Sequence, residues 1–225
     1  MAELALIRIV VERKWRQFWM RYDPQCCVSI LTTSLSNTMI KISVLATVLA
    51  AYLCTPSLAS AQSDDSAEFF SSFYWSVCKT NARNTDLLRA KLKATQLPEL
   101  PAENAKHFLA GADGDAWPVA HNGVIGNIVL ALPTGKNLCA VYARRADVQT
   151  IETLFDQFGE NPPAPIISDK QHDVYAATVP NGKTHTMSYI WTTPGDHRKL
   201  LFMLTTAESA TAELQAMGTV SVIGN

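Results

Sequence analysis

Histidines with neighbouring acids are the residues whose types and spacing are best suited to chemistry. All five histidines lie after residue 62; His172 is followed by Asp173, and Asp196 precedes His197. An imidazole beside a carboxylate is the pairing that general acid–base catalysis uses. In a strand, however, consecutive side chains point to opposite faces, so neither pair is preformed by its sequence. The sequence therefore leaves open a hydrolase whose site would assemble from His172, Asp173 and His197.

No metal or nucleophile motif supports that alternative. The histidines show neither the i, i+4 spacing nor the H-E-x-x-H form that would place two imidazoles on one metal. A G-x-S-x-G motif, which would expose a serine nucleophile, is also missing. Asp113 and Asp115 alternate as calcium ligands do, but no bidentate glutamate follows at the required spacing. We therefore expect no metal and no cofactor, and the lack of clustered catalytic residues favours a protein that is not an enzyme without deciding the matter.

One tryptophan in a glycine-rich segment is a candidate for ligand recognition. Trp117 lies within residues 111–126, which hold four glycines and which we interpret as a loop, and His121 follows it. Large aromatic residues in loops often anchor ligands or partners. They also close the end of a hydrophobic core, and that structural role is the commoner one. Trp117 and His121 are accordingly our candidates for binding residues.

An apolar run in the first quarter of the chain predicts export. Lys41 supplies a positive start, Ile42–Cys54 is apolar, and a small-residue triplet ends at Ala61. This is the layout of a secretory signal peptide, and the run is shorter than the roughly 20 residues that cross a bilayer. We therefore predict a signal peptide over residues 39–61, cleavage between Ala61 and Gln62, a periplasmic or secreted product, and no stable membrane anchor after cleavage.

The leader at residues 1–38 is unusual in front of such a signal. It is basic, and its apolar residues fall close to helical spacing, which fits a membrane-surface helix. Alternatively the start codon is assigned too early and translation begins at Met39, which we favour because the signal is complete from there. A lipoprotein site at Cys54 is disfavoured, since Leu53 stands where a small residue is needed.

The mature chain, residues 62–225, has the size of a single globular domain. It carries 13 Lys and Arg against 17 Asp and Glu, a net charge of about −4, with no basic stripe. Nucleic acid is therefore not expected as a partner, because phosphate contacts need clustered cations.

Two cysteines remain in the mature chain, Cys78 and Cys139, 61 positions apart. In an exported protein without a C-x-x-C motif, such a pair predicts one disulfide bond. The chain-entropy argument gives it roughly 4 kcal/mol of stabilisation. Two buried free thiols and a metal pair completed by histidine remain as alternatives.

Capping residues and hydrophobic periodicity indicate the elements that must position these residues. We expect helices over residues 68–80, 87–95, 103–110, 147–158 and 210–217, with Asn84 in the N-cap cluster of the second and Asp147 as the cap of the fourth. We expect strands over residues 127–132, 137–143, 174–179, 183–193 and 199–205, with a last extended piece at 219–223. In the strand at 183–193, alternation places His185 and Tyr189 on one face. Pro180-Asn181-Gly182 predicts the turn of a hairpin.

This order predicts an α+β domain. Two strands, a helix and three strands build an antiparallel sheet of about five strands, with the N-terminal helices packed on one face. The ββ-α-βββ order is that of PAS and profilin-like domains, which host many functions, so it carries no functional argument.

The signal peptide, the aromatic helix that ends in Cys78, the glycine-flanked Trp117 and Cys139 in the strand NLCAVYA resemble a group of small exported proteins of proteobacteria without an assigned activity. We expect an exported binding or accessory protein without catalytic activity. The alternatives are the hydrolase above and a subunit of an envelope or secretion assembly. Its partner is unknown; envelope proteins and a small ligand both remain open.

Overall fold

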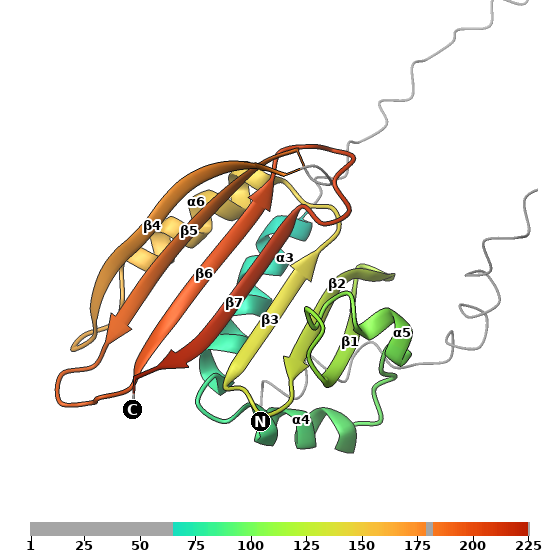
Figure 1. The fold of residues 1–225 in the computed structure, drawn as a ribbon, viewed down its shortest axis with the longest axis horizontal. Coiled ribbons are helices and arrows are strands. Elements are labelled where there is room, and N and C mark those ends of the chain that lie inside the picture. Colours follow the sequence, from blue (N-terminus) through green and yellow to red (C-terminus); the bar gives the residue numbers. More distant parts are fainter. Residues whose placement is uncertain (1–64, 179–181, 225) are drawn as a thin grey trace, which may run out of the picture. The chain divides into compact units, whose positions relative to one another are not determined.

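The computed structural model describes residues 65–178 and 182–224. Within them, seven strands form one antiparallel sheet in the order β1-β2-β3-β7-β6-β5-β4 (Figure 1). The last strand of the chain therefore lies at the centre of the sheet, between β3 and β6. The strands are β1 Gly114–His121, β2 Val124–Pro133, β3 Leu138–Ala143, β4 Ile167–Thr178, β5 Gly182–Thr192, β6 Lys199–Ala207 and β7 Ala216–Ile223.

Two long helical segments cover one face of the sheet, behind it in Figure 1. The first is α3, Ser66–Phe73, which continues into the π-helical segment η2, Tyr74–Lys79, and the second is α6, Val148–Glu160. Asp147 begins α6 as predicted, because its carboxylate accepts a hydrogen bond from the Thr150 amide. The large core between these helices and the sheet is built on aromatic side chains: Phe70, Tyr74, Trp117, Phe155, Tyr189, Trp191 and Phe202.

Helix α4, Thr85–Ala94, is capped by the Asn84 side chain, which accepts a hydrogen bond from the Leu87 amide. Leu88 and Leu92 of this helix join the large core. The short helix α5, Ala102–Ala105, belongs to a smaller core on the opposite face of the sheet.

The smaller core lies over β1, β2 and β3. Phe108, in the turn after α5, packs with Val129 of β2 and Tyr142 of β3. The Tyr142 hydroxyl donates a 2.7 Å hydrogen bond to the Phe108 carbonyl. Helical segments near the N-terminus of the domain are therefore divided between the two faces of the sheet.

The structure corrects the predicted fold. The chain is α+β, but the sheet has seven strands in a βββ-α-ββββ order instead of the five of a PAS or profilin-like order, and the N-terminal helices do not all pack on one face. We interpreted residues 111–126 as a loop because of their glycines and Pro118. Strand β1 tolerates Pro118 because β1 pairs only with β2, at the edge of the sheet, where a missing N–H breaks no second ladder.

Strand β7 was predicted only in part, as an extended piece over residues 219–223. The helix predicted over residues 210–217 is absent, because residues from Ala216 onward pair with β3 on one side and β6 on the other. Ala216 and Val220 alternate into the large core, so tertiary pairing overrides the helical preference of the segment.

Several predicted features lie outside the described residues. These are the leader over residues 1–38, the signal peptide over residues 39–61, the cleavage site at Ala61 and Gln62, and most of the hairpin turn at 180–182. In the described part of the chain, no helix has the length and apolar character needed to cross a membrane.

Candidate functional site

The structure places the two candidate binding residues in different surroundings. Trp117 is 2% exposed and packs in the large core, where its Nε1 has no hydrogen-bond partner among the described residues. His121 lies at the end of β1, with Nε2 2.8 Å from Asp65 Oδ1 and its ring stacked on that of Phe69. Trp117 thus has the position of a core residue, while His121 fastens the end of β1 to the start of α3.

The residues of the hydrolase alternative are not brought together. His172 and Asp173 follow a bulge in the edge strand β4, and they point to opposite faces of the sheet. His172 Nδ1 lies 3.0 Å from Ser188 Oγ on one face, and Asp173 contacts His185 on the other. His197 is exposed in the turn between β5 and β6.

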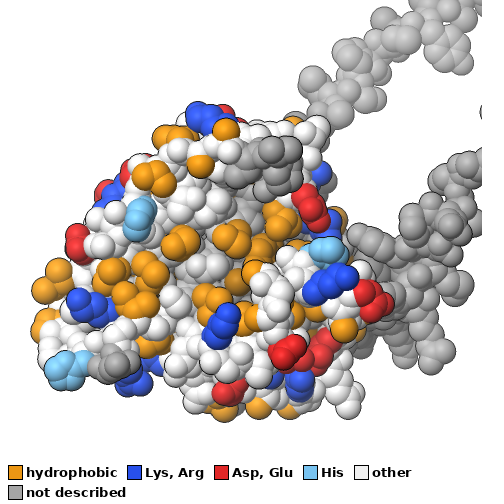
Figure 2. All heavy atoms as spheres, viewed as in Figure 1, with side chains coloured by type: hydrophobic (Ala, Val, Ile, Leu, Met, Phe, Trp, Pro, Cys, Tyr) orange, Lys and Arg blue, Asp and Glu red, His pale blue; other side chains and the backbone are white. Residues whose placement is uncertain are grey.

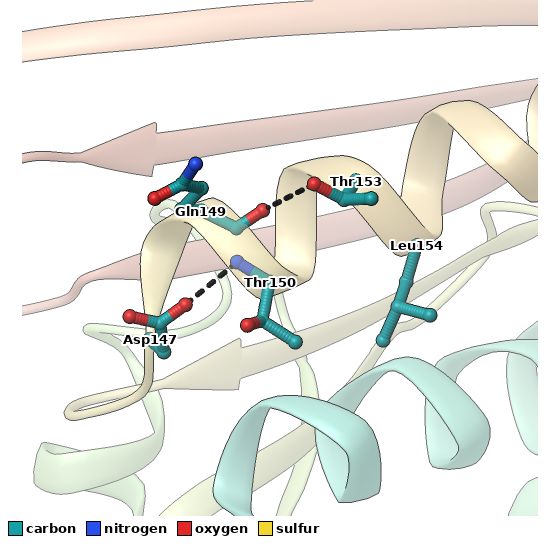
Figure 3. A pocket seen from close by; sticks show the side chains of 5 residues that line it. All are labelled: Asp147, Gln149, Thr150, Thr153 and Leu154. Carbon is teal, nitrogen blue, oxygen red and sulfur yellow. Dashed lines mark hydrogen bonds between the residues drawn. The ribbon is translucent and has the colours of Figure 1, made fainter.

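A pocket of about 270 Å³ lies at the start of α6, lined by Asp147, Gln149, Thr150, Thr153 and Leu154 (Figure 3). Its ionisable residue is Asp147, whose carboxylate caps the helix through a 2.7 Å hydrogen bond from the Thr150 amide. Hydrogen bonding from the Thr150 side chain, and after it from the Thr150 amide, lowers the pKa of Asp147. The Thr153 hydroxyl is likewise engaged with the Gln149 carbonyl, as Figure 3 shows. The pocket therefore holds a helix cap and no catalytic pair.

A cluster of titratable side chains lies where α6 crosses β4 and β5. We call it the edge cluster; its members are Glu152, Asp156, Lys170, Asp173, His185 and Tyr189. Glu152 and Asp156 are four positions apart in α6, so helical spacing places their carboxylates on one side of the helix. Strand alternation places His185 and Tyr189 of β5 on the face that α6 covers.

The two ends of the edge cluster are built differently. At one end, Lys170 Nζ lies 2.7 Å from Asp173 Oδ2 and 3.3 Å from Asp156 Oδ1, and the Tyr189 hydroxyl donates to Asp156 at 2.6 Å. At the other end, His185 lies between Asp173 and Glu152. Glu152 also accepts a hydrogen bond from the Thr206 hydroxyl of β6.

Electrostatics in the edge cluster favour the charged forms of its lysine and of Asp173. The hydrogen bond to Asp173 is the main cause that raises the pKa of Lys170 well above its ordinary value. The same contact lowers the pKa of Asp173, and the hydrogen bond from His185 lowers it further. Burial, followed by the neighbouring Asp156 carboxylate, raises the pKa of Tyr189. Lys170 therefore stays a cation and Tyr189 a neutral donor at neutral pH.

No described helix covers the opposite face of the sheet over β4, β5 and β6, and β7 borders the smaller core there. This face is turned toward the viewer in Figures 1 and 2. Hydrophobic side chains gather over its middle, and charged ones lie mostly at its margin (Figure 2). We call this surface the open face. Strand registers place ionisable residues toward its margin, Asp169 and His172 on the edge strand β4 and Lys199 at the start of β6. The other residues that the registers place on it are Ile167, Val174, Thr186, Ser188 (itself buried), Ile190, Leu201, Met203, Thr205, Met217, Thr219, Ser221 and Ile223.

Sequence reasoning identified neither the edge cluster nor the full extent of the open face. Strand alternation already placed His185 and Tyr189 on one face of β5. Nothing in the local sequence, however, indicated that Glu152 of a helix would pack over His185. The extent of the open face was not predicted, because β7, the strand at its border, was interpreted in part as a helix.

Comparisons with protein-family models, with curated proteins and with solved structures found no match for this chain. The function is therefore argued from the geometry of the chain itself.

Proposed function

We propose that this chain is an exported accessory protein, without catalytic activity, that binds a protein partner through the open face. The observation that carries the proposal is the composition of that face: apolar and hydroxyl side chains fill its middle, and the ionisable Asp169, His172 and Lys199 lie toward its margin. No described helix packs over its β4, β5 and β6 part. Extended apolar surfaces on soluble domains mark interaction sites. Interface centres are depleted in charge and enriched in methionine, and Met203 lies in the middle of this face.

The shape of the surface favours a protein partner over a small ligand. Small-molecule sites are concave and usually enclose about 300–1,000 Å³. The pocket at the start of α6 has a volume of about 270 Å³, below that range, and it lies on the helix-covered side of the sheet. The open face, in contrast, extends across four strands and suits a broad contact.

Three observations support an exported address. A signal peptide is predicted over residues 39–61, the chain resembles small exported proteins of proteobacteria, and Cys78 is bonded to Cys139. Structural disulfides persist in oxidising compartments. The periplasm of a bacterium, or the medium outside it, is the compartment that we propose.

Cross-linking in cells tests the proposed surface. Met203→Lys places a charge at the centre of the open face, and Leu87→Lys places one at an exposed leucine of α4, away from it. We expect Met203→Lys to reduce the yield of a specific cross-linked partner by about tenfold or more, the cost of burying a charge in an interface centre. Leu87→Lys should leave that yield unchanged.

Thermal unfolding of both variants verifies that the fold is intact. A partner that Met203→Lys retains in full, or one that both variants lose equally, would contradict the proposal.

A subunit of an envelope or secretion assembly is the second candidate, and the edge strand β4 favours it. This strand has 12 residues, and among the strands that the structure describes it pairs only with β5. Val174 and Tyr175, which follow its bulge, are 50% and 59% exposed. Long exposed edge strands can add to a neighbouring sheet. Native mass measurement on the purified complex separates the candidates, because an assembly subunit should be recovered in a stable, stoichiometric complex.

A further inference from the structure

His185 lies between carboxylates that come from two different elements. Its Nε2 is 2.8 Å from Asp173 Oδ1 of β4, at hydrogen-bond geometry. Its Nδ1 is 3.2 Å from Glu152 Oε1 of α6, an ion-pair contact without the alignment of a hydrogen bond. The His185 side chain is only 7% exposed. The Tyr175 ring stacks on the imidazole, with 4.0 Å between centroids and 10° between planes.

This arrangement fits a doubly protonated imidazole. A neutral imidazole has one N–H, so one of its nitrogens would turn a lone pair toward a carboxylate. The imidazolium has two N–H groups and can donate toward both acids. Burial alone would lower the pKa of His185, but the contacts with Asp173 and Glu152 outweigh it and raise that pKa above its ordinary value.

The other polar groups around His185 determine which contacts weaken when its imidazole loses a proton. From β4, Lys170 pairs with Asp173 at 2.7 Å, so Asp173 keeps a cationic partner in either state. From β6, the Thr206 hydroxyl donates to Glu152.

Further groups surround this contact. On β5, Lys183 lies over the Tyr175 ring and pairs with Glu208, and on α6 Asp156 faces Lys170. Among these residues, only His185 contacts Glu152 as a potential cation within ion-pair distance. Deprotonation therefore weakens the contact between α6 and the strands, and leaves the rest of the cluster in place.

We propose that protonated His185 forms a pH-sensitive contact that strengthens the attachment of α6 to the β4–β5 edge of the sheet, and that this contact weakens as pH rises. This inference concerns the helix-covered face and does not depend on the proposed function. A histidine whose pKa is raised in the folded state stabilises that state fully below its unfolded pKa of about 6.5, and the stabilisation is lost as pH rises through the folded pKa. The lowered pKa of Asp173 sets the lower end of the pH range in which this contact stabilises the fold. The contribution of Asp173 to stability is present above about pH 4 and is lost as pH falls through its folded pKa.

The first test is an NMR titration of the imidazole nitrogens in protein expressed from the full sequence, with the signal assigned through His185→Gln. We expect His185 to carry protons on both nitrogens at pH 6 and to titrate above 6.5. Asp173→Asn and Glu152→Gln should each lower that pKa. A His185 that titrates at or below 6.5, or whose pKa neither variant changes, would overturn the proposal.

The second test measures thermal unfolding from pH 5 to pH 9. The folding equilibrium constant of the wild type should fall about tenfold for each unit by which the folded pKa of His185 exceeds 6.5. His185→Gln should remove this dependence, while His107→Gln, at an exposed histidine beyond α5, should keep it. Equal pH profiles of the folding equilibrium constant for His185→Gln and the wild type would refute the proposal. If His185→Gln fails to fold, the pH profile of unfolding is compared between Glu152→Gln and the wild type, and equal profiles again refute the proposal.

Discussion

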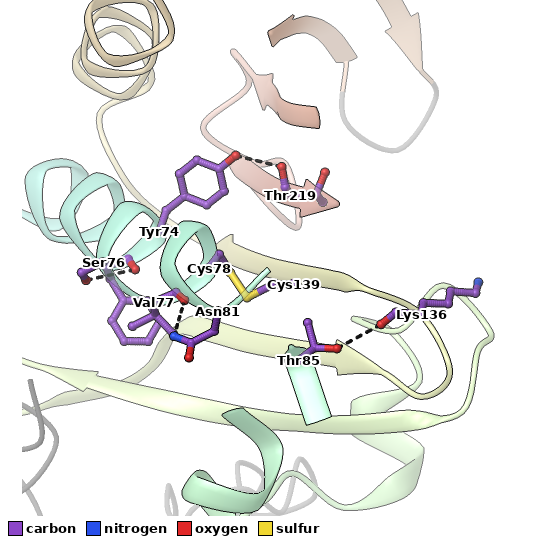
Figure 4. The surroundings of a disulfide bond; sticks show 10 residues. Tyr74, Ser76, Val77, Cys78, Asn81, Thr85, Lys136, Cys139 and Thr219 are labelled. Atoms are coloured by element: carbon purple, nitrogen blue, oxygen red, sulfur yellow. Dashed lines mark hydrogen bonds between the residues drawn. A yellow bond between two sulfur atoms is a disulfide. The ribbon is translucent and has the colours of Figure 1, made fainter. Parts of the chain in front are cut away.

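The Tyr74 hydroxyl donates a 2.8 Å hydrogen bond to the backbone carbonyl of Thr219, 145 positions later in the chain. It joins the π-helical segment η2 to β7, the central strand of the sheet (Figure 4). The Tyr74 ring lies over Gly218, where an added Cβ would come within 3.0 Å of the ring atoms Cδ2 and Cε2. A glycine at 218 therefore allows the helix to approach the sheet closely enough for this hydrogen bond.

Tyr74→Phe tests the contribution of that contact. The substitution keeps the ring but leaves the Thr219 carbonyl without its hydroxyl donor in a buried place. We expect a loss of about 1–3 kcal/mol in the free energy of unfolding, measured with urea. Tyr175→Phe is the matched control, since Tyr175 is exposed, and it should change stability by less than about 0.5 kcal/mol. Equal effects of the two variants would contradict the prediction.

The disulfide predicted from the sequence is present, with 5.3 Å between the Cα atoms of Cys78 and Cys139 (Figure 4). Both residues are fully buried, and the bond joins η2 to β3. Cys78→Ala should lower stability by about 2–5 kcal/mol in the oxidised protein, with a much smaller effect in reductant. Thiol titration of the unfolded mature protein should find no free thiol, and two free thiols would refute the prediction.

Gly159, near the end of α6, tests the packing of this helix on β5. A Cβ at this position would lie 2.5 Å from Cε2 and 2.8 Å from Cγ of Tyr189. Glycine to alanine in a helix usually stabilises by about 0.5–1 kcal/mol. Here we expect Gly159→Ala to destabilise by about 1–3 kcal/mol instead, because the ring must move.

The control for Gly159→Ala is the same substitution made in a Tyr189→Leu background, where the neighbouring side chain is smaller. In Tyr189→Leu, the alanine should cost less than in the wild type, and chemical denaturation measures both differences. A stabilising Gly159→Ala in the wild-type background would show that the helix is free to shift.

Processing of the N-terminus lies outside the described residues and stays a prediction. The small-residue triplet that ends at Ala61 follows an apolar run too short to span a bilayer. We expect N-terminal sequencing of periplasmic material to begin at Gln62. A chain that begins at Cys54, or one that retains Met39 in the membrane fraction, would contradict this.

Local signals in the sequence determined much of the secondary structure. Asn84 and Asp147 indicated where two helices begin, because their short polar side chains can accept a hydrogen bond from an amide of the first turn. Alternation in β5 placed His185 and Tyr189 on the buried face. The pair Cys78 and Cys139 predicted a disulfide because only two thiols remain in the mature chain.

Only the tertiary structure decided the sheet and the candidate site. Residues 114–121 and 216–223 are strands because β2, β3 and β6 offer them partners, and these partners are chosen by packing across the whole domain instead of by local preference. The same is true of the edge cluster. Glu152 and His185 come together because α6 crosses the strands, and no spacing within either segment encodes the angle of that crossing. Local propensity acts over a few residues, while the burial that fixes these contacts involves segments far apart in the sequence.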